Sequence, residues 1–356
     1  MSFPLISIRA LRNVCTVPPT AAQLKISQAF WSAMDDDTDY KPALLEPYFS
    51  YYTEQCKAYH SYLRKGFHSL THPDLVELAK DLKRGRTRQD VRANVQLKMN
   101  AAGSSEFPGI PNVCADHLLN LVGRLLLMTD IGRLPAGGNW TGRAFRDWSG
   151  GSIHNFTANA FPIQQSCRHE SIRLDLDFNA RNLYFIGGLK IELTNNLLDH
   201  LEVVYFEGET TVMIFHHVCF LQNQQHEYFP PGFIAETLQT LALLFPQGKW
   251  FKKTKAWYTK ELRPVTPDAD PAILACGTVT MTEFSDYRYW HDRLVRLKLL
   301  FDQAKPRTLR QWWNDRRDRQ WHALWAAVAL GILFGLVQSI EGAVQIYMAY
   351  HPDGGK

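Results

Sequence analysis

The sequence lacks paired cysteines. Six are scattered without a C-x-x-C pair or a repeating spacing: Cys15, Cys56, Cys114, Cys167, Cys219 and Cys276. An even number would permit disulfides, but the basic residues before the C-terminal apolar run predict a cytosolic location, where thiols stay reduced. We therefore interpret these cysteines as small buried side chains.

A secretory signal and a large excess of charge are also missing. Pro4 and Arg9 interrupt the first twelve residues, so the apolar core of a signal peptide is absent. The net charge is +4 over 356 residues, which is small for a dedicated nucleic-acid binder. We expect no nucleic-acid partner.

Familiar catalytic and nucleotide-binding motifs are absent as well. The sequence contains no G-x-S-x-G, H-E-x-x-H, Walker or Rossmann pattern. The glycines between Gly137 and Gly142 lack the Lys-Ser/Thr of a phosphate-binding loop. We assign no catalytic residue, metal site or cofactor, although an enzyme of a new kind remains open.

What the chain does have is one long apolar run near its C-terminal end. From Trp321 to Val337 the sequence carries one polar residue, His322, and apolar character returns at Ile346–Tyr350. At about 1.5 Å per residue, Ala323–Ala343 covers roughly 30 Å, the thickness of the hydrocarbon core of a bilayer. The run predicts a single transmembrane helix at residues 321–350. The alternative is a buried core helix.

The flanks of this run predict its orientation. Basic residues precede it: Lys305, Arg307, Arg310, Arg316, Arg317 and Arg319. Lys356 alone follows, so the positive-inside rule places the N-terminal part in the cytosol. A helix this close to the end of the sequence favours tail-anchored insertion. Asn139 and Asn155 begin glycosylation sequons that would be used only if the orientation were reversed.

Small residues recur every four positions within the apolar run. Ala327, Gly331, Gly335 and Ser339 form a stripe that allows two helix backbones to approach closely. We expect the membrane lipid as one partner and a second copy of the helix as another. The alternative is that the stripe reflects the ordinary abundance of Gly and Ala in membrane helices.

The rest of the chain predicts an α+β fold, a mostly helical cytosolic domain with a small mixed α/β lobe. We divide it into a helical region (1–132), a Gly-rich connector (133–170), an α+β lobe (171–304), a basic juxtamembrane segment (305–320), the transmembrane helix (321–350) and a short tail (351–356).

Apolar periodicity and caps predict the elements of the soluble part. Helices are expected at 21–34, 48–70, 87–99, 111–129, 233–245, 289–302 and 308–320, and strands at 172–178, 183–193 and 211–215. Thr87 and Asp90 form a capping-box pattern. Lys80–Arg88 is interpreted as a solvated connector, and contact with acidic lipid headgroups or nucleic acid is the alternative. One or two helical turns are expected within Asn195–Leu201.

Histidines provide the candidate chemistry. His216 and His217, with His200 and His226, have the ligand type that metals accept, but neighbours on a strand point to opposite faces. His291 and Asp292 have the residue types of an acid/base pair on the polar face of a helix. A structural role is the favoured interpretation of all of them.

Several blocks of sequence resemble a set of uncharacterised filamentous-fungal proteins. The blocks are Ile186–Leu201, Ile214–Leu221 with FHH, Pro231–Pro246 with ETLxTLALLFP, Tyr289–Leu294 with WHDRL, Gln311–Arg317 with QWWxDRR, and Gly335–Ala343. Leu193 departs from the tryptophan common in that set. The resemblance implies a fungal source, a C-terminal membrane helix and an accessory genomic cluster whose products influence growth form or colony surface. It implies no activity.

Together these patterns predict a single-pass membrane protein that acts as an interaction or scaffold protein with an unknown protein partner. The alternative is a membrane-tethered enzyme with an unrecognised site around His216, His217 and His291.

Overall fold

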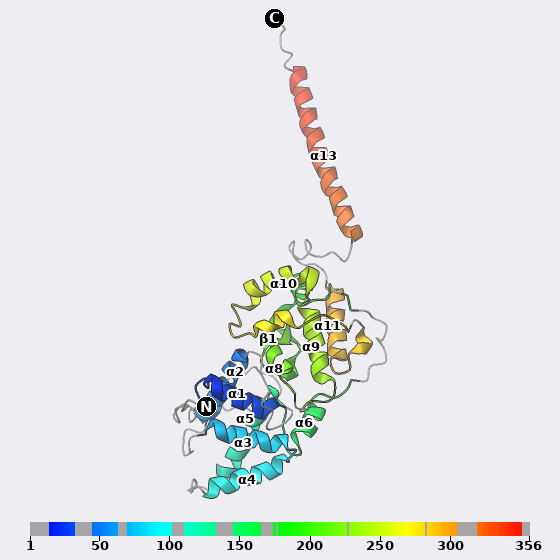
Figure 1. Cartoon of the computed structure of the whole chain (residues 1–356). Coiled ribbons are helices and arrows are strands. Elements are labelled where there is room, and N and C mark those ends of the chain that lie inside the picture. Colours follow the sequence, from blue (N-terminus) through cyan, green and yellow to red (C-terminus); the bar gives the residue numbers. More distant parts are fainter. Residues whose placement is uncertain are drawn as a thin grey trace. The chain divides into compact units, whose positions relative to one another are not determined.

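The computed structural model describes residues 14–32, 45–62, 70–101, 110–132, 145–164, 174–175, 177–225, 228–281, 283–304 and 319–350. The chain divides into two units, Met1–Ala304 (unit 1) and Lys305–Lys356 (unit 2). Figure 1 draws both, and each is described here by itself.

The first part of unit 1 is helical. Its helices are α1 (Thr20–Trp31), α2 (Glu46–Tyr62), α3 (His72–Lys83), α4 (Arg88–Ala101) and α5 (Ile110–Leu127). The α5 helix contacts α2, α3 and α4, and α1 packs on α3. Apolar side chains of α5 are buried on more than one side, at Leu118, Leu119, Leu121, Val122 and Leu125–Leu127. This helix is therefore the centre of the helical part.

Two capping boxes begin α3 and α4. The Thr87 hydroxyl accepts the Asp90 backbone N–H at 3.2 Å, and the Asp90 carboxylate accepts the Thr87 backbone N–H at 3.3 Å. Thr71 and Asp74 make the same reciprocal pair one helix earlier. The predicted box at Thr87 is confirmed, because each partner satisfies an N–H that the helix itself leaves unpaired.

The prediction of a solvated connector at Lys80–Arg88 is wrong for its first four residues, which form the last turn of α3, a helix that was not predicted. It is also wrong for Arg88, which begins α4 and is buried. The α3 helix buries Leu75, Leu78 and Leu82, spaced by three and four residues along one face. Lys83 is buried with its Nζ 3.4 Å from the Ala29 carbonyl oxygen, so it is not a surface charge.

The second part of unit 1 contains a mixed sheet. Its strands are β1 (Lys190–Thr194), β2 (Val203–Phe206) and β3 (Glu209–Phe215), in the order β1-β3-β2. The β1 strand pairs with β3 in parallel, and β2 pairs with β3 in antiparallel orientation. Glu207 (φ 49°) and Gly208 (φ 82°) make the two-residue turn between β2 and β3. Because β1 and β3 are parallel, the residues after both strands meet at one edge of the sheet.

Two strand predictions need correction. The described residues of 172–178 form no strand, and Leu183–Phe185 belong to α7 (Ala180–Phe185) instead of a strand. The Asn179 side chain caps α7 by accepting the Asn182 backbone N–H at 3.0 Å, which starts a helix where the apolar pattern suggested alternation. A Cβ at Gly187 would lie 2.6 Å from the Leu183 carbonyl oxygen, so glycine allows the tight turn into β1.

The remaining elements of unit 1 are helical. They are α6 (Ile153–Ala160), η1 (Leu197–Asp199), α8 (Val218–Gln222), α9 (Phe233–Leu244), η2 (Gly248–Trp250), α10 (Phe251–Trp257), η3 (Tyr258–Leu262), η4 (Pro271–Ala275), η5 (Phe284–Asp286) and α11 (His291–Gln303). The predictions of a helical turn after Asn195, a strand at 211–215 and helices at 233–245 and 289–302 are confirmed with small shifts of their ends.

One aromatic core joins the two parts of unit 1. The Trp31 ring meets Phe220 edge to face at 5.5 Å, and Tyr48 stacks on Phe220 at 6.1 Å. The Tyr228 hydroxyl donates to the Phe30 carbonyl oxygen at 2.8 Å. Burial of such rings removes large apolar areas from water, so the helical and mixed parts stabilise each other.

Unit 2 is described as one helix, α13 (Arg319–Tyr350). Its window Ala327–Tyr350 is 24 residues long, has a mean hydropathy of 1.8 and buries none of its side chains. It is long and apolar enough to cross a membrane. The chain is thus mostly helical, with a small mixed sheet and a C-terminal apolar helix, as predicted. The predicted helix at 308–320 lies outside the described residues, except for its last two positions.

Candidate functional site

His216 and His217 lie at the edge of the sheet where β1 and β3 end. They follow β3 directly and precede α8, while Asn195 directly follows β1. The two imidazole rings stack with centroids 4.0 Å apart. The expectation that these neighbours point to opposite faces is therefore wrong. It assumed a continuing strand, and β3 ends at Phe215.

Both rings converge on one amide oxygen. His216 Nε2 lies 2.9 Å and His217 Nε2 2.7 Å from Asn195 Oδ1. The Asp270 backbone N–H donates to His216 Nδ1 at 3.1 Å, so a neutral His216 carries its proton on Nε2 and donates it to Asn195. His217 Nδ1 is buried without a hydrogen-bond partner among the described residues. Asn195 is exposed, whereas both histidines are buried.

The electrostatics of this edge favour neutral groups. Burial lowers the pKa of His216 to about 3 and that of His217 well below its usual value. Burial, with the nearby Asp270, raises the pKa of the Cys219 thiol to about 12. The rings are therefore uncharged and the thiol protonated at neutral pH, which is unfavourable for a thiolate nucleophile.

Asp270 uses its carboxylate to hold backbone. Its Oδ2 accepts the Cys219 N–H at 2.7 Å and its Oδ1 accepts the Ala272 N–H at 2.9 Å. These bonds fasten the starts of α8 and η4 together. No spacing pattern in the sequence links Asp270 to α8, so this role was not predicted.

His200 does not join this pair. Its Nε2 contacts Thr240 Oγ1 at 2.7 Å, and its Nδ1 accepts the Phe215 N–H at 3.2 Å. Burial, followed by the charge of Arg293, lowers the pKa of His200 to about 3. His226 lies outside the described residues. Among the residues described, no group of three His, Cys, Asp or Glu could hold a metal ion.

His291 and Asp292 contact each other at the start of α11. His291 Nδ1 lies 3.0 Å from Asp292 Oδ1, with His291 buried and Asp292 exposed. His291 Nε2 has no hydrogen-bond partner within the described chain. The preceding Glu236 carboxylate, on α9, accepts the backbone N–H groups of residues 288–290 at 2.8–2.9 Å and holds this segment in place. The Glu236 role was not predicted.

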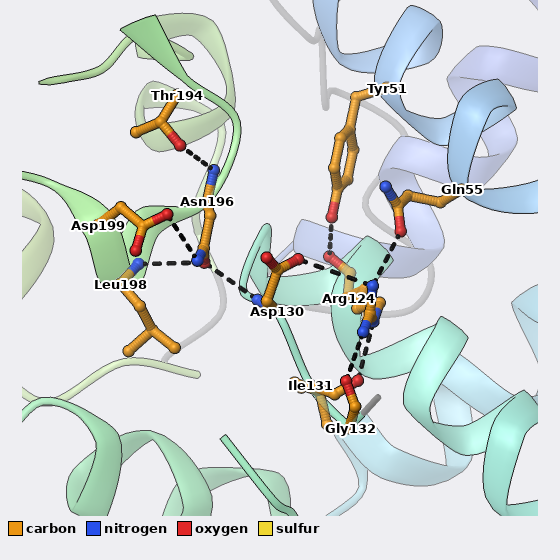
Figure 2. A network of polar contacts seen from close by, with 10 residues as sticks. All are labelled: Tyr51, Gln55, Arg124, Asp130, Ile131, Gly132, Thr194, Asn196, Leu198 and Asp199. Atoms are coloured by element: carbon orange, nitrogen blue, oxygen red, sulfur yellow. Dashed lines mark hydrogen bonds and ion pairs between the residues drawn. The ribbon is translucent and has the colours of Figure 1, made fainter. Parts of the chain in front are cut away.

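A second polar network joins the helical part to the sheet (Figure 2). The buried Arg124 guanidinium donates from Nε to the Ile131 carbonyl oxygen at 2.8 Å and from Nη2 to that of Gly132 at 2.6 Å. Its Nη1 lies 3.6 Å from Asp130 Oδ1 and 3.4 Å from Gln55 Oε1. Arg124 thus fixes the loop after α5 from within.

Asn196 continues this network on the sheet side. Its Oδ1 accepts the Asp130 N–H at 3.0 Å and the Leu198 N–H at 3.3 Å, and its Nδ2 donates to Asp199 Oδ2 at 3.1 Å. Figure 2 shows these bonds running from Arg124 through Asp130 to Asn196. The donors end on backbone carbonyls, carboxylates and side-chain amide oxygens, an arrangement typical of a structural joint.

The residues expected to pack in the membrane lie on α13. Ala327, Gly331, Gly335 and Ser339 are all exposed, and the Ser339 hydroxyl donates to the Gly335 carbonyl oxygen of its own helix at 2.8 Å. An added Cβ at Gly331 or Gly335 would meet no atom within 4 Å, so the helix surface around both glycines is uncovered.

The other predicted sites are only partly described. Arg307, Arg310, Arg316, Arg317 and Asn139 lie outside the described residues, and Arg319 begins α13. Asn155 is exposed in α6, two residues before the buried Thr157. The orientation and the use of either sequon stay predictions.

No family model, curated protein or solved structure matches this chain.

Proposed function

We propose that the chain is a single-pass membrane protein that holds unit 1 in the cytosol as an interaction or scaffold module. The observation that carries the proposal is the unburied apolar window of α13, 24 residues long. Exposed apolar side chains on this scale are costly in water and are stabilised by lipid or by another helix. The membrane lipid, a second copy of α13 and a protein that binds unit 1 are the proposed partners.

The polar clusters of unit 1 support binding over catalysis. Arg124, Asn196, Glu236 and Asp270 hold backbone groups, and the His216–His217 pair is buried and neutral. The resemblance to filamentous-fungal proteins adds a proposed fungal origin and a role in growth form or colony surface.

Membrane anchoring is tested by carbonate extraction of cells that express the full chain. We expect the chain to remain in the membrane pellet. Val337→Arg, near the middle of the α13 window, should release a measurable fraction, because arginine at a helix centre costs about 3 kcal/mol of insertion free energy. Val337→Ala is the control and should stay in the pellet. Recovery of the unsubstituted chain in the supernatant would refute the proposal.

The same membranes test the orientation. Protease added to intact vesicles should digest unit 1 and leave a short protected fragment that contains α13. Protection of unit 1, or a glycan on Asn155, would place it on the other side.

The second candidate is a membrane-tethered enzyme. The unpartnered nitrogens on His217 and His291 favour it, because such atoms are uncommon in buried histidines. His217→Gln and His291→Gln should leave partner binding and cellular function intact if unit 1 is a scaffold, and abolish function if these rings are catalytic.

A further inference from the structure

One surface of unit 1 is strongly basic, and it was not predicted from the sequence. It covers η2, α10 and η3 and carries six exposed cationic side chains: Lys249, Lys252, Lys253, Lys255, Lys260 and Arg263. Between residues 248 and 263 the sequence has one acidic residue, Glu261. We call these six side chains the basic face. Figure 1 shows α10 at the periphery of unit 1.

Buried side chains fix the direction of this face. Thr254, Trp257, Tyr258 and Leu262 point inward along the same stretch. The Trp257 ring contacts Tyr184 at 5.8 Å, and the Tyr258 ring meets Phe245 edge to face at 6.3 Å. The lysines are therefore presented together by an anchored helix instead of a loose loop.

The basic face is not neutralised by the described residues of unit 1. None of its six cations forms an ion pair with a carboxylate among the residues that the structure describes. Lys249 and Lys253 instead lie 5.7 Å and 5.4 Å from the Trp250 ring centroid, and Lys255 lies 5.9 Å from that of Phe251. Trp250 and Phe251 are half-buried, so aromatic surface remains between the cations.

This mixture matches an acidic lipid surface. Lysines attract acidic headgroups by about 1 kcal/mol each near the surface, and partly exposed tryptophan and phenylalanine settle at the boundary between headgroups and acyl chains. Val265, 76% exposed just beyond η3, adds apolar area next to the cations. Nucleic acid would also attract the charges, but it leaves the membrane-length helix of the same chain unexplained.

The covalent connection keeps unit 1 near the membrane that holds α13. The chain from residue 305 to residue 318, which joins Ala304 to Arg319, can extend to at most about 50 Å. A surface tethered over this range meets its membrane at a high effective concentration, so weak attraction is sufficient for docking.

We propose that the basic face docks on acidic headgroups of the bilayer that holds α13. This inference rests on the proposed membrane anchoring. Unit 1 would then lie with α10 against the lipid and present its other surfaces to the cytosol. Loss of acidic lipid, or high salt, would release it while α13 stayed inserted.

The test compares full-length protein in vesicles of phosphatidylcholine alone and of phosphatidylcholine mixed with phosphatidylserine. A membrane-impermeant amine reagent labels the lysines, and mass spectrometry reads the rate at each one. We expect Lys252, Lys253 and Lys255 to react at least about fivefold more slowly on acidic vesicles, an effect removed by salt. Lys25, exposed on α1, should react equally on both.

A pair of variants with the same change in charge makes the test specific. Lys252→Glu combined with Lys253→Glu should abolish the protection of Lys255. Lys25→Glu combined with Lys57→Glu, two exposed positions elsewhere in unit 1, should preserve it.

Equal labelling rates of Lys255 on neutral and acidic vesicles would overturn the inference. An RNA oligonucleotide that slows the labelling of Lys255, when acidic lipid does not, would overturn it as well. A chain that associates with neither kind of vesicle would instead refute the anchoring on which the inference depends.

Discussion

Arg124 is the residue on which the joint within unit 1 depends most. Its side chain is 3% exposed, and its donors serve the carbonyl oxygens of Ile131 and Gly132 besides the Asp130 carboxylate. Removing the charge leaves the buried carbonyl oxygens of Ile131 and Gly132 short of a partner, and it leaves the partly exposed Asp130 without its ion pair to Arg124.

Arg124→Met should therefore lower the free energy of unfolding by about 3 kcal/mol, measured by denaturant titration of the full chain in mild detergent. Arg84→Met is the matched control, because Arg84 faces solvent and lies 3.9 Å from Asp81. It should change the free energy by less than about 1 kcal/mol. Equal effects of the two substitutions would contradict the role given to Arg124.

Buried histidines make the stability of unit 1 depend on pH. The folded-state pKa of His200 and of His216 is lowered to about 3 by burial, so the unfolded chain binds more protons near neutral pH. Their contribution to the free energy of unfolding is complete above the pKa of about 6.5 that they have in the unfolded chain. It is lost as the pH falls from there toward 3. Burial raises the pKa of Glu236 and Asp270, which offsets part of this loss at acidic pH.

When the pH falls from 7.5 to 5.0, each of these two histidines should lower the free energy of unfolding by about 2 kcal/mol. Denaturant titrations at the two pH values measure the difference. His200→Gln keeps an acceptor for the Phe215 N–H and should reduce the pH dependence by about 2 kcal/mol. An unchanged dependence in that variant would show that His200 is not protonated on unfolding.

At the scale of helices and strands, a single capping motif could be predicted from the sequence. The outcome of a competition between a cap and an apolar pattern could not. The capping box at Thr87 and Asp90 follows from two side chains three residues apart. The error at Leu183–Phe185 arose because the Asn179 cap outweighs an apolar pattern that also suits a strand. Asn196 and Asp130 could not be paired from the sequence, because their contact depends on the packing of α5 beside the sheet.

The stripe of small residues on α13 leads to a prediction about the association of this helix with a second copy. Gly335→Ile should weaken association between copies in vesicles about fivefold, because a branched side chain separates two closely packed backbones. Energy transfer between donor-labelled and acceptor-labelled copies measures the association. Ala329→Ile adds a similar side chain outside the stripe, about 120° round the helix from Gly335, and should have little effect. Similar losses in both variants would mean that the stripe is not the contact.

For the whole molecule, the balance of elements was predictable, whereas the candidate sites were predictable only as residue types. The apolar run led directly to α13, because length and composition suffice for that inference. The convergence of His216 and His217 on Asn195 required knowing that β1 and β3 are parallel and end together. The basic face was overlooked because its cations are interleaved with apolar residues, and burial of the latter is a property of the fold.

The aromatic core shared by the two parts of unit 1 has a consequence for the order of folding. Phe30 and Trp31 complete their contacts through Phe220 and Tyr228, which are synthesised much later. Until those residues leave the ribosome, the early helices keep large rings in water and are open to aggregation or chaperone capture. A fragment that stops at Gly132 should accordingly behave as a sticky, incompletely folded intermediate, not as an autonomous helical module.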